Sequence, residues 1–204
     1  MRLNDVWNVY LKNNGVDFVR FIDISSLTGN VAGEYACAVL FGKILTKGYL
    51  QAIRDGRKPE RQEFGIAEHA MDALADKFSE KLASEGYKSV SRIRSPLLPH
   101  KTIARLAGIG FIGKNTLLIS NEYGGAVVLG KVLTNAPFLS EPPQPMEPQC
   151  GECNVCAEIC PAKALLGKQW SITTSRNEML VRKLCNPCMK CMVYCPYTVR
   201  YMDS

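Results

Sequence analysis

The chain has 204 residues, of which 47% are hydrophobic, and a formal net charge of +6 at pH 7. This size and composition fit a globular protein with a packed core, and the spread of the basic residues favours an ordinary surface over a nucleic-acid patch. No apolar run reaches the roughly 18 residues of a membrane span, and no signal peptide opens the chain. We therefore expect a cytoplasmic protein without membrane contact, in which the nine cysteines are metal ligands or redox groups rather than disulfides.

The first half of the chain alternates predicted helices and strands. A first helix is expected with Asn4 as its cap and Gly15 just past its end. Its apolar stripe comprises Val6, Trp7, Tyr10 and Leu11. Residues 16–24 and 36–41 read as strands, the second apolar throughout like a strand buried on both faces. The charged residues 54–64 are expected to form a loop.

Two further helices and a hairpin are predicted before residue 136. An amphipathic helix over 66–82 follows from the spacing of its apolar residues, which are Ala67, Met71, Leu74, Phe78 and Leu82. A short helix is expected over 102–106. Runs 117–120 and 126–134 flank the turn residues NEYGG, which predicts a hairpin or close strand pair. The mixture predicts an α+β fold.

A proline-rich stretch divides the chain. Five of the thirteen residues 137–149 are proline, which favours a stiff, extended linker over regular structure. We therefore predict an α/β domain over residues 1–136 and a cysteine-rich domain over residues 150–204.

Eight of the nine cysteines fall in two copies of one spacing, Cys-x2-Cys-x2-Cys-x3-Cys-Pro. This is the spacing of two-cluster ferredoxins, in which the fourth cysteine of each run ligates the other cluster. We predict two 4Fe–4S clusters in a ferredoxin-like module. The expected ligand sets are a first set of Cys150, Cys153, Cys156 and Cys195, and a second set of Cys160, Cys185, Cys188 and Cys191.

Structural zinc, which also takes four thiolates, is the alternative, and two complete copies ending in Cys-Pro disfavour it. Pro161 suits the first position of a helix over AKALLG. The ninth cysteine, Cys37, lies in an apolar run and is expected to be a small buried hydrophobe. Trp170, Tyr194 and Tyr197 are expected to shield the clusters from water.

Three glycines, Gly108, Gly110 and Gly113, match the G-x-G-x-x-G pattern. A dinucleotide fingerprint requires a strand before the glycines and a helix after them, and here the predicted order is reversed. A phosphate-binding loop is also rejected, because Asn115 replaces its hydroxyl residue. The remaining interpretation is that the glycines let the backbone closely approach another element or a flat cofactor.

The run HKTIARLAGIGFIGKNTLLI, the run NEYGGAVVLGKVLTNAP and the paired cysteine motifs together resemble the epoxyqueuosine reductases, over roughly residues 85–204. The resemblance implies a nitroreductase-like, cobalamin-binding domain that faces one cluster, an arrangement shared with reductive dehalogenases. It implies an iron–sulfur oxidoreductase that passes electrons from reduced ferredoxin or flavodoxin to cobalt and reduces a small-molecule or partner-borne substrate.

The cofactor contacts that this resemblance implies are His100, Lys101, Gly108, Gly110, Gly113, Lys114, Asn115 and Thr116. His100 is also the candidate catalytic proton donor, because an imidazole titrates near neutral pH. A hydrogen bond to the backbone or to a cofactor amide is the alternative role for His100. The other histidine, His69, is expected to be solvated, and surface or turn roles are favoured for Lys101, Lys114 and Tyr123.

Two departures from the family pattern weaken the expectation of epoxide reduction on tRNA. The family places an aspartate shortly before the glycines, whereas this chain has no Asp or Glu between Glu85 and Glu122 and reads RIRSP at 92–96. Longer members also continue into a tRNA-binding extension, and nine residues follow Cys195 here. An electron-transfer protein that serves another protein's corrinoid is therefore an alternative, as is a ferredoxin module fused to a cofactor-free domain.

Overall fold

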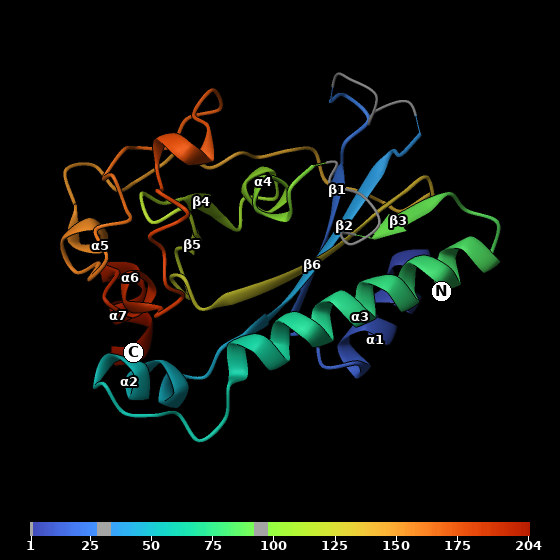
Figure 1. The fold of residues 1–204 in the computed structure, drawn as a ribbon. Coiled ribbons are helices and arrows are strands. Elements are labelled where there is room, and N and C mark those ends of the chain that lie inside the picture. The colour runs from blue at the N-terminus through green and yellow to red at the C-terminus, as the bar shows by residue number, and fades with distance from the viewer. Residues whose placement is uncertain (1, 28–33, 92–97) are drawn as a thin grey trace. The chain divides into compact units, whose positions relative to one another are not determined.

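The computed structural model describes residues 2–27, 34–91 and 98–204 and confirms a mixed α+β fold (Figure 1). The segment 92–96 lies outside the described residues. Contacts divide the chain into two compact units. The first unit comprises residues 1–44, 64–108 and 128–145, and the second comprises residues 45–63, 109–127 and 146–204. These units are interleaved along the sequence, whereas the predicted domains 1–136 and 150–204 are consecutive, and that division stays a prediction.

The first unit is built on a four-stranded sheet in the order β1-β2-β6-β3. Its strands are β1 (Phe18–Asp23), β2 (Cys37–Ile44), β3 (Ser89–Ser91) and β6 (Val127–Thr134). β1 runs antiparallel to β2, with Phe18 opposite Gly42, and β3 runs antiparallel to β6. Six consecutive residues of β2 are buried, which confirms a strand covered on both faces.

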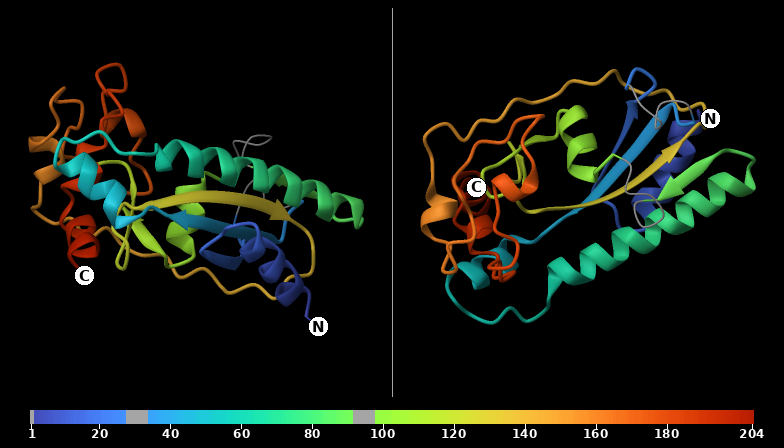
Figure 2. Two further views of the ribbon diagram at one scale, coloured as in Figure 1. Left: turned by 90° about the horizontal axis from the view of Figure 1, so that it is seen from below. Right: turned by 45° about the horizontal axis from the view of Figure 1, so that its top comes forward.

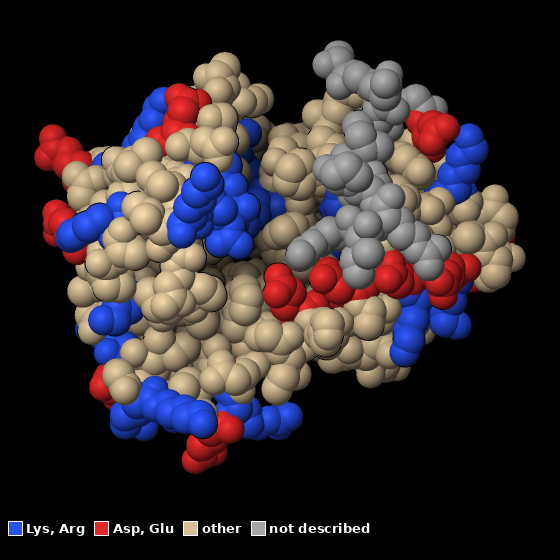
Figure 3. Space-filling model, in the orientation of Figure 1, with Lys and Arg blue, Asp and Glu red and all other residues tan. Residues whose placement is uncertain are grey.

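Three helices belong to this unit: α1 (Leu3–Asn13), α3 (Glu63–Ser84) and α4 (His100–Leu106). α3 runs along the sheet (Figure 2) and buries all five residues of the stripe predicted for it. Acidic residues recur on this helix at four-residue intervals, and Figure 3 shows acidic side chains in a row along it. These residues are Glu68, Asp72, Asp76 and Glu80. The helix is therefore amphipathic, as its spacing predicts.

The start of α1 corrects one prediction. Arg2, rather than Asn4, is the cap residue. Asn4 instead exchanges two 2.9 Å hydrogen bonds with the backbone of Leu139, and this pairing occupies the amide that was expected to cap the helix. Val6 is also exposed, whereas Trp7 is buried with its ring 5.0 Å from that of Phe78.

Residues 137–149 contain no helix or strand, but they are not a free linker. Glu141 exchanges two 2.8 Å backbone hydrogen bonds with β1, through Phe21 and Asp23. The Gln144 N–H donates to the carbonyl oxygen of Leu106 at the end of α4. The first part of this stretch is therefore anchored to the sheet and to α4.

The second unit contains the helices α2 (Lys47–Arg54), α5 (Val155–Glu158), α6 (Lys190–Val193) and α7 (Pro196–Asp203), the 3-10 helix η1 (Arg176–Glu178) and the strands β4 (Gly110–Ile112) and β5 (Leu118–Ser120). α2 was not predicted, although Thr46 caps it by accepting a hydrogen bond from the Tyr49 N–H. The Tyr194 hydroxyl donates to the Arg54 carbonyl, which fixes α2 beside the second cysteine motif. Among the described helices, none has the length and apolarity to cross a membrane.

Two local predictions are wrong in this unit. The first is the hairpin across NEYGG, since β5 pairs with β4 rather than with β6. The turn closes a single bridge between Ser120 and Gly124, and the chain then enters the four-stranded sheet as β6. No helix follows Pro161 either. Leu165 instead pairs with Leu180 in a bridge, which takes the backbone out of helical geometry.

Candidate functional site

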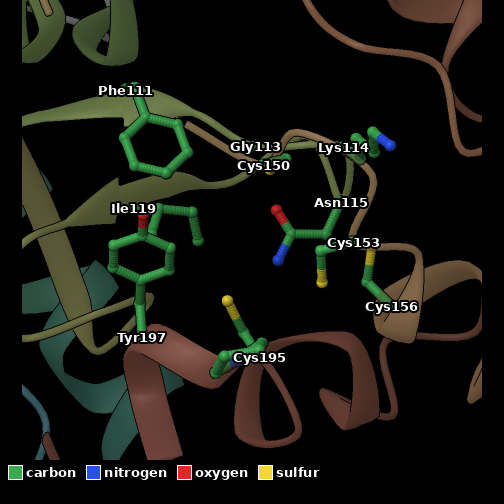
Figure 4. Close-up of a pocket in the computed structure, with 11 residues that line it drawn as sticks. Phe111, Gly113, Lys114, Asn115, Ile119, Cys150, Cys153, Cys156, Cys195 and Tyr197 are labelled. Carbon is green, nitrogen blue, oxygen red and sulfur yellow. The ribbon is translucent and has the colours of Figure 1, made fainter. Parts of the chain in front are cut away.

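Four cysteines line one pocket in the second unit (Figure 4). They are Cys150, Cys153, Cys156 and Cys195, the four members of the first predicted set. Cys156 is carried by α5, and Cys195 directly precedes α7. The pocket is completed by Phe111, Gly113, Lys114, Asn115, Ile119, Pro196 and Tyr197. The fold thus brings together four cysteines that span 45 positions of the sequence.

The second set is also gathered in this unit. Cys160, Cys185 and Cys191 pack against a small buried cluster formed by Cys156, Ala164, Leu165 and Leu180. Cys188 is close enough to Cys191 to affect its titration. The cysteine spacing predicted this set, and the role of its members as cluster ligands stays a prediction.

The thiols differ in how readily they ionise. Burial, followed by the neighbouring cysteines, raises the pKa of Cys156 to about 11 and that of Cys191 to about 12. At Cys160 burial also acts to raise the pKa, but N–H donors from Ala164, Ala162 and Leu165, together with the charge of Lys163, outweigh it and the pKa is lowered. The Ala164 nitrogen lies 3.3 Å from the Cys160 sulfur. Backbone donors therefore stabilise a thiolate at Cys160.

Alkylation of the cluster-free protein should follow this order. A raised pKa keeps a thiol protonated and unreactive until the pH approaches it, so at pH 8 iodoacetamide should modify Cys160 well before Cys156 and Cys191. Cys37, whose pKa burial raises to about 12, should be the control that stays unmodified. Peptide mass spectrometry over time measures these rates, and equal rates at Cys160 and Cys191 would contradict the assignment.

Lys114 and Asn115 hold the glycine-rich stretch against both cysteine motifs. Both residues are buried, with 6% and 4% of their surface exposed. The Asn115 amide nitrogen donates to the Cys191 carbonyl at 3.0 Å, and its oxygen accepts from the Leu117 N–H at 3.1 Å. The Lys114 ammonium donates to the side-chain oxygen of Asn154 at 3.0 Å. Asn154, which lies between Cys153 and Cys156 of the first motif, was not among the predicted site residues.

Replacing Asn115 by Ala should destabilise the second unit. The change leaves the Leu117 N–H and the Cys191 carbonyl without this partner, which costs about 1–3 kcal/mol for each buried group left unsatisfied. Urea unfolding of the cluster-free protein measures the loss. Asn186→Ala, at an exposed position in the second motif, is the control, and an equal effect of both changes would argue against the role of Asn115.

The glycines of this stretch are required by the chain itself. A Cβ on Gly110 would lie 2.3 Å from the Ile119 carbonyl oxygen, and one on Gly113 would lie 2.8 Å from the Asn115 side-chain oxygen. Gly108 adopts a φ of +67°. The close approach that glycine permits is therefore to another element of the protein. The stretch follows α4 and leads into β4 and β5, which supports rejecting a dinucleotide fingerprint.

The remaining candidates lie in several places. His100 and Lys101 begin α4 in the first unit, are half-buried and do not line the cysteine pocket. Thr116 lies in the turn between β4 and β5 with a φ of +63°. His69 is exposed, as predicted. The role of His100 as a proton donor stays a prediction.

Of the three aromatic residues expected to cover the clusters, one lies at the pocket. Tyr197 lines the pocket, with its ring centroid 5.3 Å from that of Phe111. Trp170 and Tyr194 are half-buried, but the pocket lining includes neither. Phe111 and Ile119 were missed, although both lie in or beside the glycine-rich motif. Cys37 is buried, as expected of a small hydrophobe.

Comparison with known proteins bears out the family resemblance. No family model matches the chain. An epoxyqueuosine reductase from Listeria monocytogenes is 43% identical over 109 residues, covering 47% of this chain and 28% of that protein. One from Lactococcus garvieae is 33% identical over 132 residues, covering 58% and 37%. These alignments therefore span only 28% and 37% of the length of the two curated relatives.

Solved structures share the fold. A crystal structure of a selenomethionine-labelled epoxyqueuosine reductase matches 97% of this chain and 66% of its own, with a TM-score of 0.61 at 20% identity. An epoxyqueuosine reductase with an epoxyqueuosine-modified tRNA stem loop matches with a TM-score of 0.58 at 19% identity. A reductive dehalogenase described as B12-dependent matches 90% of this chain and 30% of its own, with a TM-score of 0.61 at 17% identity.

Proposed function

We propose that this chain is an epoxyqueuosine reductase-like iron–sulfur oxidoreductase, in which two 4Fe–4S clusters carry electrons to a corrinoid. The observation that carries the proposal is the pocket that joins Cys195 to Cys150, Cys153 and Cys156. The second motif thereby supplies the fourth thiol of the first set, as cross-ligation in a two-cluster ferredoxin requires.

The residues present fit the clusters. The four thiols of the first set come from both motifs and line one pocket, as the cross-ligated cluster of a two-cluster ferredoxin requires. When bound, such clusters supply one-electron transfer. The chain's own part is to bind them through thiolates, to donate backbone N–H groups to Cys160 and to keep water from the first set with Phe111 and Tyr197.

The corrinoid is supported more narrowly. Contacts within the second unit already account for the placement of Gly110, Gly113, Lys114 and Asn115, so their placement does not by itself argue for a corrinoid. His100, Lys101, Gly108 and Thr116 are the proposed corrinoid contacts that remain. The support is the resemblance to relatives that include a B12-dependent dehalogenase, and we assign no step through the corrinoid.

The partners in this proposal follow the relatives. Reduced ferredoxin or flavodoxin is the proposed donor, and the substrate is a small molecule or a partner-borne group, such as the modified tRNA named for one relative. Two alternatives are less favoured, because the relatives named above are reductases and dehalogenases. These are an electron-transfer protein without its own substrate site and a module fused to a cofactor-free domain.

Anaerobic reconstitution with iron, sulfide and hydroxocobalamin tests the proposal. After desalting, we expect about eight irons per chain and corrinoid absorption bands in stoichiometric amount. His100→Ala together with Lys101→Ala should retain the iron and lose most of the corrinoid. Iron without any corrinoid in the unaltered protein would contradict the corrinoid part and favour the electron-transfer alternative.

A further inference from the structure

A lysine side chain is buried beside the first cysteine set. Lys114 has 6% of its surface exposed, although lysine is rarely buried without a paired charge. It lines the pocket with the four cysteines (Figure 4), and its ammonium donates to Asn154, which lies between Cys153 and Cys156. The Asn154 side chain is a neutral amide, so this hydrogen bond does not neutralise the charge of Lys114.

The second set offers a contrasting lysine. Lys163 follows Cys160 by three residues and donates to the Glu158 carbonyl at 2.9 Å, but its side chain is exposed. Water and salt screen an exposed charge strongly, whereas a buried charge acts through a medium of low dielectric constant. The lysines near the second set, which are Lys163, Lys183 and Lys190, are thus exposed, whereas Lys114 beside the first set is buried.

A cluster held by four thiolates becomes more negative when it accepts an electron, so a buried cation beside it favours its reduced form. We propose that Lys114 raises the reduction potential of the cluster held by the first set and makes this cluster the preferred position of the first electron. This inference rests on the proposed function. The step transfers one electron from an external reductant such as dithionite to the cluster, and no bond within the protein is formed or broken.

Potentiometric titration of the reconstituted protein, followed by electron paramagnetic resonance, tests the inference. Lys114→Gln removes the charge and keeps a donor for Asn154. It should lower the reduction potential of one of the two clusters. The ratio of reduced to oxidised cluster should fall at least tenfold at a given potential, which corresponds to about 59 mV for one electron. The other step should change by less than threefold. Lys114→Arg, which keeps the charge, should restore the ratio to within threefold, and Lys163→Gln should leave both steps within threefold.

Iron content separates the possible failures. Fewer than about six irons in the unaltered protein would contradict the proposed function itself. Full iron in Lys114→Gln with both steps unchanged would overturn only the role of Lys114, as would an equal shift in Lys163→Gln. Lys114→Met serves as a second neutral variant. Loss of iron in both neutral variants, with Lys114→Arg fully loaded, would show that the charge serves assembly and would also overturn the proposal.

Discussion

The double variant Cys150→Ser/Cys195→Ser is expected to keep about four irons per chain, whereas Cys185→Ser/Cys195→Ser is expected to keep almost none. The first pair lies in one proposed set, because both residues line the same pocket. The second pair takes one ligand from each set. If each motif instead held its own cluster, these two results would be exchanged.

Iron and acid-labile sulfide in the reconstituted variants, normalised to protein, provide the measurement. Cys37→Ser is the control, since this buried residue lies in the first unit, outside both sets, and should leave the iron content unchanged. Circular dichroism shows whether a variant that lacks iron is still folded. Four irons in the Cys185→Ser/Cys195→Ser variant would rule out cross-ligation.

The second large effect is expected at Gly124, where replacement by Ala should destabilise the second unit by about 2–5 kcal/mol. This range combines a left-handed backbone, which costs a residue with a Cβ about 1–2 kcal/mol, with overpacking, which costs about 1–3 kcal/mol. Gly124 has a φ of +55°, and an added Cβ would lie 2.3 Å from the backbone nitrogen of Thr198 in α7. The Thr198 nitrogen and the Thr198 Cα, which would lie 2.4 Å from the added Cβ, are both backbone atoms, so they cannot move aside as a flexible side chain would.

Gly56 offers a matched control for this prediction. Its φ is +72°, but an added Cβ would have nothing within 4 Å. Gly56→Ala should therefore cost only the backbone term, about 1–2 kcal/mol. Urea unfolding of the cluster-free proteins measures both changes, and equal costs would show that α7 does not pack on Gly124 as described.

Features that depend on local pattern were predictable from the sequence. α3 buries the stripe that its spacing indicates, and β2 is buried along most of its length. Both elements carry a long periodic or apolar signal that tertiary packing did not override. α2 was missed because its eight residues are fewer than the roughly 10–12 over which a helical pattern is usually recognised, although its capping residue Thr46 was a usable signal.

Features that depend on pairing between distant parts of the chain could not be predicted from the sequence. The sequence around NEYGG indicates a turn correctly, but the partner of β5 is the three-residue β4, which is too short to be recognised by alternation. The asparagine at the start of α1 was assigned to a cap because a cap is local, whereas its partner Leu139 lies 135 residues away. In the candidate site, spacing identified the cysteines, but burial of Lys114 and its bond to Asn154 became visible only in the fold.

The most direct test of two 4Fe–4S clusters is a metal and sulfide analysis of the anaerobically purified protein. We expect about eight irons and about eight acid-labile sulfides per chain, with negligible zinc. About two zinc ions per chain without sulfide would contradict the account, because the same eight thiolates would then serve two structural sites that carry no electrons.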